Sequence, residues 1–188
     1  TLPDYRIVDL ILGKQRRTKM GRGGVAPMQF ETFSRGMQRA ITNYCKDGGR
    51  IFVSGAYVGS DLFNSPDATP ADQFFATNTL RFKWRVGQAS STGSVRGIAS
   101  PYPAFEGVYE YYAEPNSDSY VVESPDGIEP VDESGHTIMR YTETRISAGV
   151  AYAGKYRTCV FGFPFESIKK ESDRDRIMQS VLSFLNEE

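Results

Sequence analysis

Two short apolar runs, separated by one amphipathic segment, constrain the fold of this chain more than any other feature. The runs are residues 5–13 (YRIVDLILG) and 50–55 (RIFVSG). Both are rich in Ile, Leu and Val, which is typical of strands buried on both faces. Between them, apolar side chains recur every three or four residues and predict a helix over 29–46, ended by Gly48-Gly49. A strand–helix–strand unit predicts two parallel neighbouring strands joined by a right-handed crossover.

The remainder of the chain changes character twice. Thr69-Pro70-Ala71-Asp72 is a capping signal with Pro at the first helical position, and it predicts a short helix through Leu80. Residues 81–163 are mostly short strand-like runs and turns, including a hairpin about Gly154-Lys155. Amphipathic spacing then predicts a last helix over 172–186.

Length and composition predict one ordinary globular domain. The chain has 188 residues, of which 39% are hydrophobic and 24% charged. No apolar run approaches the ~20 residues of a membrane span, and a net charge of −1 without a recognisable module argues against nucleic acid. Thr1 starts the chain without a Met, so we expect a mature product or a fragment. Cys45 and Cys159 lie in apolar patterns that favour buried free thiols over a disulfide, and one histidine with two cysteines builds no zinc site.

Residues 51–63 (IFVSGAYVGSDLF) have the layout of a strand, a sharp turn and a helix. Many α/β enzymes use this device to present a nucleophile. Gly55 and Gly59 would allow the tight backbone, and Ser60-Asp61 would start the helix. The residue at the apex is Tyr57, for which we expect a strained backbone conformation.

The segment GGRIFVSGAYVG (48–59) resembles the Gly-x-Cys-x-Gly segment of class I glutamine amidotransferases, and VFGFPFES (160–167) resembles their closing Gln-Phe-His-Pro-Glu motif. Laid on this chain, the cysteine position falls on Tyr57, the histidine on Pro164 and the glutamate on Glu166. The resemblance implies an α/β, flavodoxin-like doubly wound sheet with a mostly parallel core and antiparallel hairpin additions. It also implies a single domain over 1–188 with a strand-rich insertion at 81–145, truncated at its N-terminus.

More narrowly, VDLILGKQ, SGAYVGSDL, AGVAY and GFPFESI resemble the amidotransferase-like domain of large secreted bacterial proteins that carry the label xanthan lyase. That resemblance implies a secreted or periplasmic location and a role in polysaccharide processing. It also implies that other domains of the same polypeptide are partners.

Amidotransfer needs a thiolate, a histidine that accepts its proton and an acid that orients the histidine. Tyr57 has a phenol instead, and only Glu166 of the triad remains, so we expect a degenerate, non-catalytic domain without metal or cofactor. The alternative is a polysaccharide lyase or hydrolase whose active site is not recognised. In that case His136 and Arg140, which alternate onto one strand face, are candidates for a base and a uronate-binding cation.

A binding site is predicted where the strands of the first unit end, because ligands of open α/β sheets lie outside the carboxyl ends of the strands. Residues 14–22 (KQRRTKMGR) follow the first strand and contain five cations and no acid. An anionic carbohydrate bound there is one interpretation, and a mobile, solvated loop is the other. The residues proposed to bind it are Lys14, Arg16, Arg17, Lys19, Arg22, Gly55, Tyr57 and Gly59. Several aromatic residues, namely Trp84, Tyr102, Phe105, Tyr109, Tyr111 and Tyr112, form either a sugar-stacking surface or part of the core.

Overall fold

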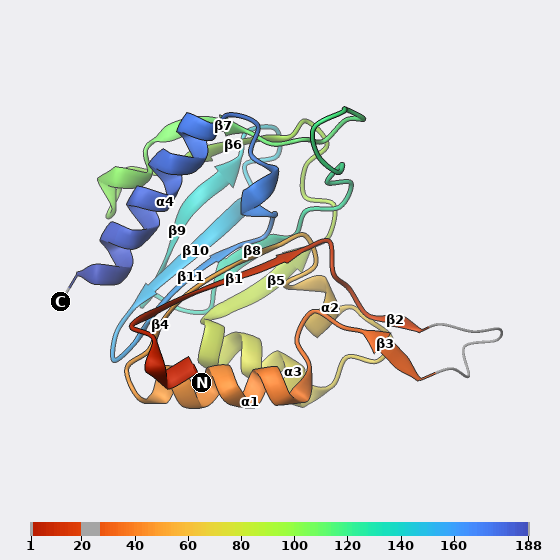
Figure 1. The fold of residues 1–188 in the computed structure, drawn as a ribbon, viewed down its shortest axis with the longest axis vertical. Helices are drawn as coiled ribbons and strands as arrows, with labels where there is room; N and C mark the ends of the chain where they lie inside the picture. The colour runs from red at the N-terminus through yellow and green to blue at the C-terminus, as the bar shows by residue number, and fades with distance from the viewer. Residues whose placement is uncertain (1, 20–26, 188) are drawn as a thin grey trace.

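The computed structural model describes residues 2–19 and 27–187 as a mixed α/β fold (Figure 1). The strands are β1 (Ile7–Gly13), β2 (Thr18–Lys19), β3 (Met28–Phe30), β4 (Arg50–Gly55), β5 (Phe82–Val86), β6 (Ser94–Gly97), β7 (Gly107–Glu110), β8 (Gly127–Pro130), β9 (Gly135–Tyr141), β10 (Ser147–Ala153) and β11 (Arg157–Phe161). The helices are α1 (Arg35–Lys46), α2 (Ser60–Phe63), α3 (Pro70–Phe75) and α4 (Glu171–Asn186), with short helical turns at Leu2–Asp4, Ala76–Leu80, Pro103–Phe105 and Phe165–Ser167.

The main sheet has seven strands in the order β1-β4-β11-β10-β9-β6-β7. Two pairings are parallel, β1 with β4 and β4 with β11. The other four pairings are antiparallel: β11 with β10, β10 with β9, β9 with β6, and β6 with β7. The prediction of a parallel β1–β4 pair is confirmed, whereas the prediction of a mostly parallel, flavodoxin-like doubly wound sheet is wrong.

The physical reason lies in the connections between strands. A doubly wound sheet needs a crossover helix between successive parallel strands, and α1 supplies one between β1 and β4. After α3 no α-helix lies between the described strands β5 to β11, and the successive pairs β6–β7, β9–β10 and β10–β11 are antiparallel. The strands of 81–145 are therefore shared between sheets: β6, β7 and β9 enter the main sheet, and β5 pairs with β8 in a separate two-stranded sheet.

The sheet separates two hydrophobic cores, and β4 contributes to both. Ile51 and Val53 belong to the core under α1, whereas Phe52 belongs to the core under α4. This alternation follows from the two-residue period of a strand. Figure 1 shows α1 and α3 on one side of the sheet and α4 on the other.

Local signals explain where the helices begin. Residues Met28–Phe30 form β3, which pairs with β2, so α1 begins at Arg35 and not at 29 as predicted. Ser34 caps it by accepting a hydrogen bond from the Met37 amide. The predicted capping box at Thr69 and Asp72, the 154–155 hairpin, the C-terminal helix and both free cysteines are confirmed.

The prediction for the first strand needs correction. β1 was expected to be buried on both faces, but it is an edge strand of the main sheet, and Ile11 is 51% exposed. No helix among residues 2–19 and 27–187 is long and apolar enough to cross a membrane.

Candidate functional site

A cleft of about 510 Å³ lies where β1 and β4 end, which is the place predicted for a ligand. We call it the basic cleft; its lining includes Arg16, Arg17, Lys19, Tyr57, Ser60 and Ser124. The segment after β1 supplies the cations, and the turn after β4 (residues 56–59) together with α2 supplies the opposite wall.

Arg16 and Tyr57 are in contact in this cleft. The Arg16 guanidinium lies over the Tyr57 ring, 5.3 Å from its centroid. Tyr57 is half-buried and packs on the core under α4, so the ring is held in place from below. Arg16 is exposed. A fixed aromatic ring with a cation above it holds the guanidinium in place and leaves its positive charge directed to the cleft.

The other cations of the segment are neutralised by acids. Lys14 Nζ is 2.7 Å from Glu123 Oε1, and Lys19 Nζ is 2.7 Å from Asp67 Oδ1. Arg22 lies outside the described residues. Among the described cations of this segment, only Arg16 therefore has no ion pair, and the cleft is less positive than the sequence predicts.

Arg17 has a structural partner. Its guanidinium is 7% exposed and lies 3.1 Å from the fully buried carboxylate of Asp72. Burial acts to raise the pKa of Asp72, but hydrogen bonds from Gln38, Thr69 and Arg17 outweigh it and hold that pKa below its ordinary value. Arg17 thus anchors the loop to α3.

Asp61 fixes the same loop from the side of α2. Its Oδ2 accepts hydrogen bonds from the Arg17 amide at 2.7 Å and from the Thr32 amide at 3.1 Å. The predicted helix start is confirmed, since α2 begins at Ser60, but neither Ser60 nor Asp61 is the N-cap: Gly59 is, and no side chain caps the helix. The buried carboxylate of Asp61 instead holds two loops together.

Beneath the cleft, the carboxylate of Asp126 binds backbone amides at the start of α2. Its Oδ2 accepts hydrogen bonds from the backbone amides of Gly59 and Ser60, each at 2.7 Å. Its Oδ1 accepts a hydrogen bond from the Trp84 indole at 3.1 Å. An internal anion therefore occupies the position next to the turn where an external anion was expected.

Asp126 is also tied to the main sheet through its backbone. Its amide donates to the Gly162 carbonyl at 2.7 Å, and its own carbonyl accepts from the Tyr141 hydroxyl at 2.8 Å. The side chain is fully buried. Burial raises the pKa of Asp126 to about 7, although the hydrogen bonds from Ser60, Gly59 and Trp84 act in the opposite direction.

The turn itself is shaped by close packing. A Cβ on Gly59 would lie 2.7 Å from Trp84 Cδ1, and a Cβ on Gly55 would lie 3.0 Å from Leu12 Cβ. The described non-glycine residues with positive φ are Arg81, Gln88 and Arg145. Tyr57 is not among them, so the glycines serve the approach of neighbouring side chains and Tyr57 shows no left-handed strain.

Glu166 lies near the turn in space, with Gly13 of β1 between them. A Cβ on Gly13 would be 3.3 Å from Glu166 Oε1, and the Gly13 carbonyl accepts a hydrogen bond from the Ala56 amide. The Tyr120 hydroxyl donates to Glu166 Oε1 at 2.5 Å. Pro164, at the histidine position of the resemblance, precedes the turn Phe165–Ser167.

Glu166 also lines a separate cavity of about 610 Å³, which we call the Glu166 cavity. Its other lining residues include Ile11 and Lys169.

The residues of the lyase alternative are engaged elsewhere. The His136 ring lies 5.9 Å from the Tyr102 ring, edge to face, and Tyr102 packs on Phe184 of α4. Arg140 donates to the Arg145 carbonyl at 2.9 Å. Neither side chain lines the basic cleft or the Glu166 cavity. Of the aromatic residues weighed as a sugar surface, Phe105, Tyr109 and Tyr111 are fully buried core residues.

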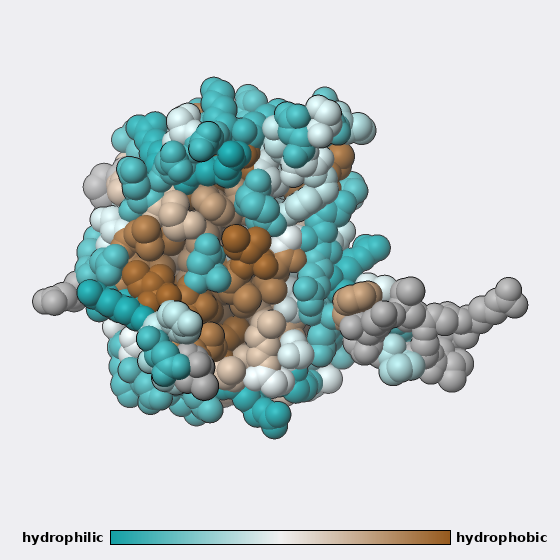
Figure 2. Space-filling model, viewed as in Figure 1, coloured by the Kyte–Doolittle hydropathy of each residue, from teal (hydrophilic) through white to brown (hydrophobic). Residues whose placement is uncertain are grey.

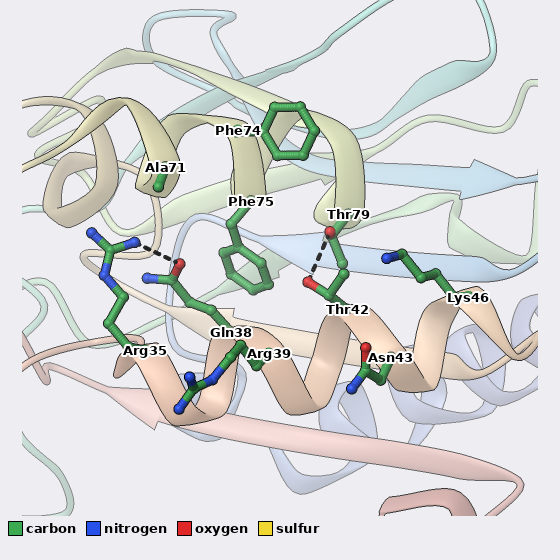
Figure 3. A pocket seen from close by; sticks show the side chains of 10 residues that line it. All are labelled: Arg35, Gln38, Arg39, Thr42, Asn43, Lys46, Ala71, Phe74, Phe75 and Thr79. Carbon is green, nitrogen blue, oxygen red and sulfur yellow. Dashed lines mark hydrogen bonds between the residues drawn. The ribbon is translucent and has the colours of Figure 1, made fainter.

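A third cavity, of about 460 Å³, lies between α1 and α3 (Figure 3). Phe75 points from α3 toward α1, and Thr42 and Thr79 are hydrogen-bonded across the gap at 3.2 Å. Arg35 at one end is bound to Asp72 and to Thr69. Arg35 therefore serves the α1–α3 contact.

Comparisons with known proteins assign this chain to no family. No family model and no curated protein matches the chain. One similar solved structure is exo-β-1,4-mannosidase Op5Man5 from Opitutaceae bacterium strain TAV5, at 12% identity and a TM-score of 0.44. The match covers 81% of this chain and 22% of that chain. A likeness at this level transfers no activity, and none of the comparisons supports the amidotransferase resemblance.

Asp126 is the residue that sequence reasoning missed. It lies in SPDGIEP, within an acidic stretch that reads as a solvated loop. The partners of its carboxylate other than Ser60 Oγ and the Ser60 amide, namely the Gly59 amide and the Trp84 indole, are 67 and 42 positions away along the chain. No local pattern marks it, because an Asp before Gly is equally typical of an exposed turn.

Gly59→Ala should destabilise the protein by about 1–3 kcal/mol, because the added methyl would overlap the Trp84 side chain. Chemical unfolding would measure the change. The control is Gly36→Ala in α1, where the nearest atom would be Ser34 Oγ at 4.0 Å, and we expect it to be neutral or stabilising by up to about 1 kcal/mol. Equal effects at the two positions would contradict the packing account.

The fluorescence of Trp84, the only tryptophan of the chain, should titrate with a midpoint near pH 7, because protonation of Asp126 weakens the bond to the indole. The titration should vanish in Asp126→Asn and persist in His136→Gln, which removes the only histidine.

The free energy of unfolding should also depend on the protonation of Asp126. The folded pKa of Asp126, about 7, lies above the value of about 3.9 for an unfolded Asp, so stability should fall as pH rises between these values. Asp126→Asn should flatten that fall in chemical unfolding at several pH values. A wild-type profile that rises across this window would contradict the assignment.

Proposed function

We propose that this chain is a non-catalytic binding domain for an acidic carbohydrate, and that the basic cleft is its ligand site. The supporting observation is the Arg16 guanidinium held over the Tyr57 ring at the carboxyl ends of β1 and β4. A uronate offers the matching group, a carboxylate that can accept two hydrogen bonds from the guanidinium held over the ring. The volume of the cleft, about 510 Å³, suits a small ligand.

The absence of chemistry in this proposal rests on the groups present at the turn. Tyr57 has a phenol where amidotransfer needs a thiolate, and the only histidine is packed against Tyr102. The amides that follow the turn are already bound by Asp126. The proposal therefore assigns recognition to side chains at the rim and a structural role to the turn beneath it.

The rival function, a lyase or hydrolase, has one pair of residues in its favour. Tyr120 and Glu166 share a hydrogen bond beside the Glu166 cavity. Burial, the hydrogen bond to Glu166 and the charge of Glu166 all raise the pKa of Tyr120. A phenol whose pKa is raised is a poor base near neutral pH, so this pair supports a structural contact better than proton abstraction.

The wider context of the domain belongs to the same proposal. A secreted or periplasmic polysaccharide-processing protein, with this domain attached to others of the same polypeptide, would provide acidic sugar chains as ligands. A binding domain raises the local concentration of such chains near a neighbouring domain.

The purified chain should release no ammonia from glutamine, because no thiolate–histidine pair is present at the turn. A coupled ammonia assay would measure this, with a known glutaminase as the positive control. Release that depends on Tyr57 or Glu166, tested with Tyr57→Phe and Glu166→Gln, would overturn the non-catalytic assignment.

Calorimetry with oligogalacturonate should show weak binding that declines with salt, because the contact includes one exposed cation. Arg16→Ala should weaken binding about tenfold, equal to about 1.4 kcal/mol. The matched control is Arg85→Ala, an exposed arginine of β5 that pairs with Glu129 and does not line the cleft.

A neutral oligosaccharide of equal length completes that design and should bind less well than the uronate. The proposal fails if Arg16→Ala and Arg85→Ala bind alike, or if the neutral sugar binds as tightly as the acidic one.

A further inference from the structure

β1 is an open, apolar edge of the main sheet. It stands at one end of the sheet order, and within the described part of the chain it is paired in the sheet only with β4. Its seven residues read IVDLILG, with Asp9 as the single charge. Figure 2 shows an apolar surface where this strand faces the viewer, framed by hydrophilic residues on the sides of α1 and α4. The two helices cover the faces of the sheet and leave this edge uncovered.

The opposite edge of the sheet is built differently. β7 has four residues, Gly107–Glu110, and ends in a charged side chain. Short strands and charges are the usual protection of a free edge, whereas a long apolar edge invites another strand. The contrast between β7 and β1 indicates that β1 is the edge at which a strand is added.

The side chains of β1 alternate between the two cores. Val8, Leu10 and Leu12 face the core under α1, and Ile7 packs on the core under α4. A strand added to this edge would extend both layers only if it also carried apolar side chains on both faces. Among the described strands with a free edge, β1 itself has this pattern over seven residues.

We propose that β1 pairs antiparallel with β1 of a second copy of this chain, which joins the two main sheets into one continuous sheet across a two-fold axis. Such an interface is self-complementary, as two-fold dimers require. With the axis at Leu10, Val8 lies opposite Leu12 of the second copy, and Leu10 lies opposite its own equivalent.

Charge is compatible with this register. Asp9 lies opposite Ile11 of the second copy, so the two carboxylates do not face each other. The net charge of −1 leaves little repulsion between copies. Because the paired strands run in opposite directions, the basic clefts lie at opposite ends of the joint sheet and both stay open.

Light scattering after size exclusion should give the mass of a dimer for the wild type. Ile11→Glu places a carboxylate at a position that is 51% exposed and that faces Asp9 of the second copy in this register, so the fold is retained while like charges oppose strand addition. We expect its dimer dissociation constant to rise at least about tenfold. The matched control is Val108→Glu on β7, which is 49% exposed at the opposite edge and should remain dimeric.

Cross-linking tests the register. Leu10→Cys should form an intermolecular bond under mild oxidation or with a short dimaleimide, since this position meets its own equivalent. Cys45 and Cys159 are buried and give no background. Leu182→Cys, 40% exposed on α4, is the control and should stay uncross-linked at the same protein concentration.

Three results would overturn the proposal: a wild type that is monomeric at every concentration, a dimer lost in Val108→Glu but kept in Ile11→Glu, or a dimer in which Leu10→Cys does not cross-link. A monomer that takes up an extended apolar peptide at β1 would show strand addition by a different polypeptide and would exclude the second copy. None of these results bears on the basic cleft, so failure here is separate from failure of ligand binding.

Discussion

The buried carboxylate of Asp126 is the interaction on which the functional end of this molecule depends. Taking a carboxylate out of water costs several kcal/mol unless hydrogen bonds replace the lost solvent. Here two backbone amides of the β4–α2 turn and the Trp84 indole provide them. Because the backbone of Asp126 is bound to Gly162 and Tyr141, the turn, β5 and the main sheet are fixed to one another through a single residue.

This arrangement explains how a turn typical of nucleophile presentation exists without a nucleophile. In an enzyme, amides at such a turn are left free for a developing negative charge. Here the protein supplies the negative charge from its own chain, so the turn becomes a structural joint. In the proposed binding site, recognition falls to groups that reach solvent, of which Arg16 over Tyr57 has the best geometry.

The two edges of the sheet show a second constraint. A sheet of mixed direction ends in two strands whose outer hydrogen-bonding groups need water or another strand. β7 is short and charged at its end, as a water-facing edge should be. β1 is long and apolar, yet it also carries the loop that lines the cleft. Covering β1 with another strand would stabilise the element from which the binding loop departs.

The sequence by itself determined the elements that depend on local patterns. The parallel pair β1–β4, the capping box at Thr69, the hairpin at 154–155 and the last helix follow from periodicity, capping and turn chemistry within a few residues. The same reasoning placed a basic loop and Tyr57 at one end of the sheet, where Arg16, Arg17, Lys19 and Tyr57 line one cleft. Only the tertiary structure decided the direction of the remaining strands, because short strands joined by turns carry no signal for the sheet they join. It also decided which charges stay free, since Lys14, Arg17 and Lys19 meet acids that are distant in sequence. Asp126 became the centre of the site for the same reason: burial and long-range partners, not its neighbours along the chain, set its role.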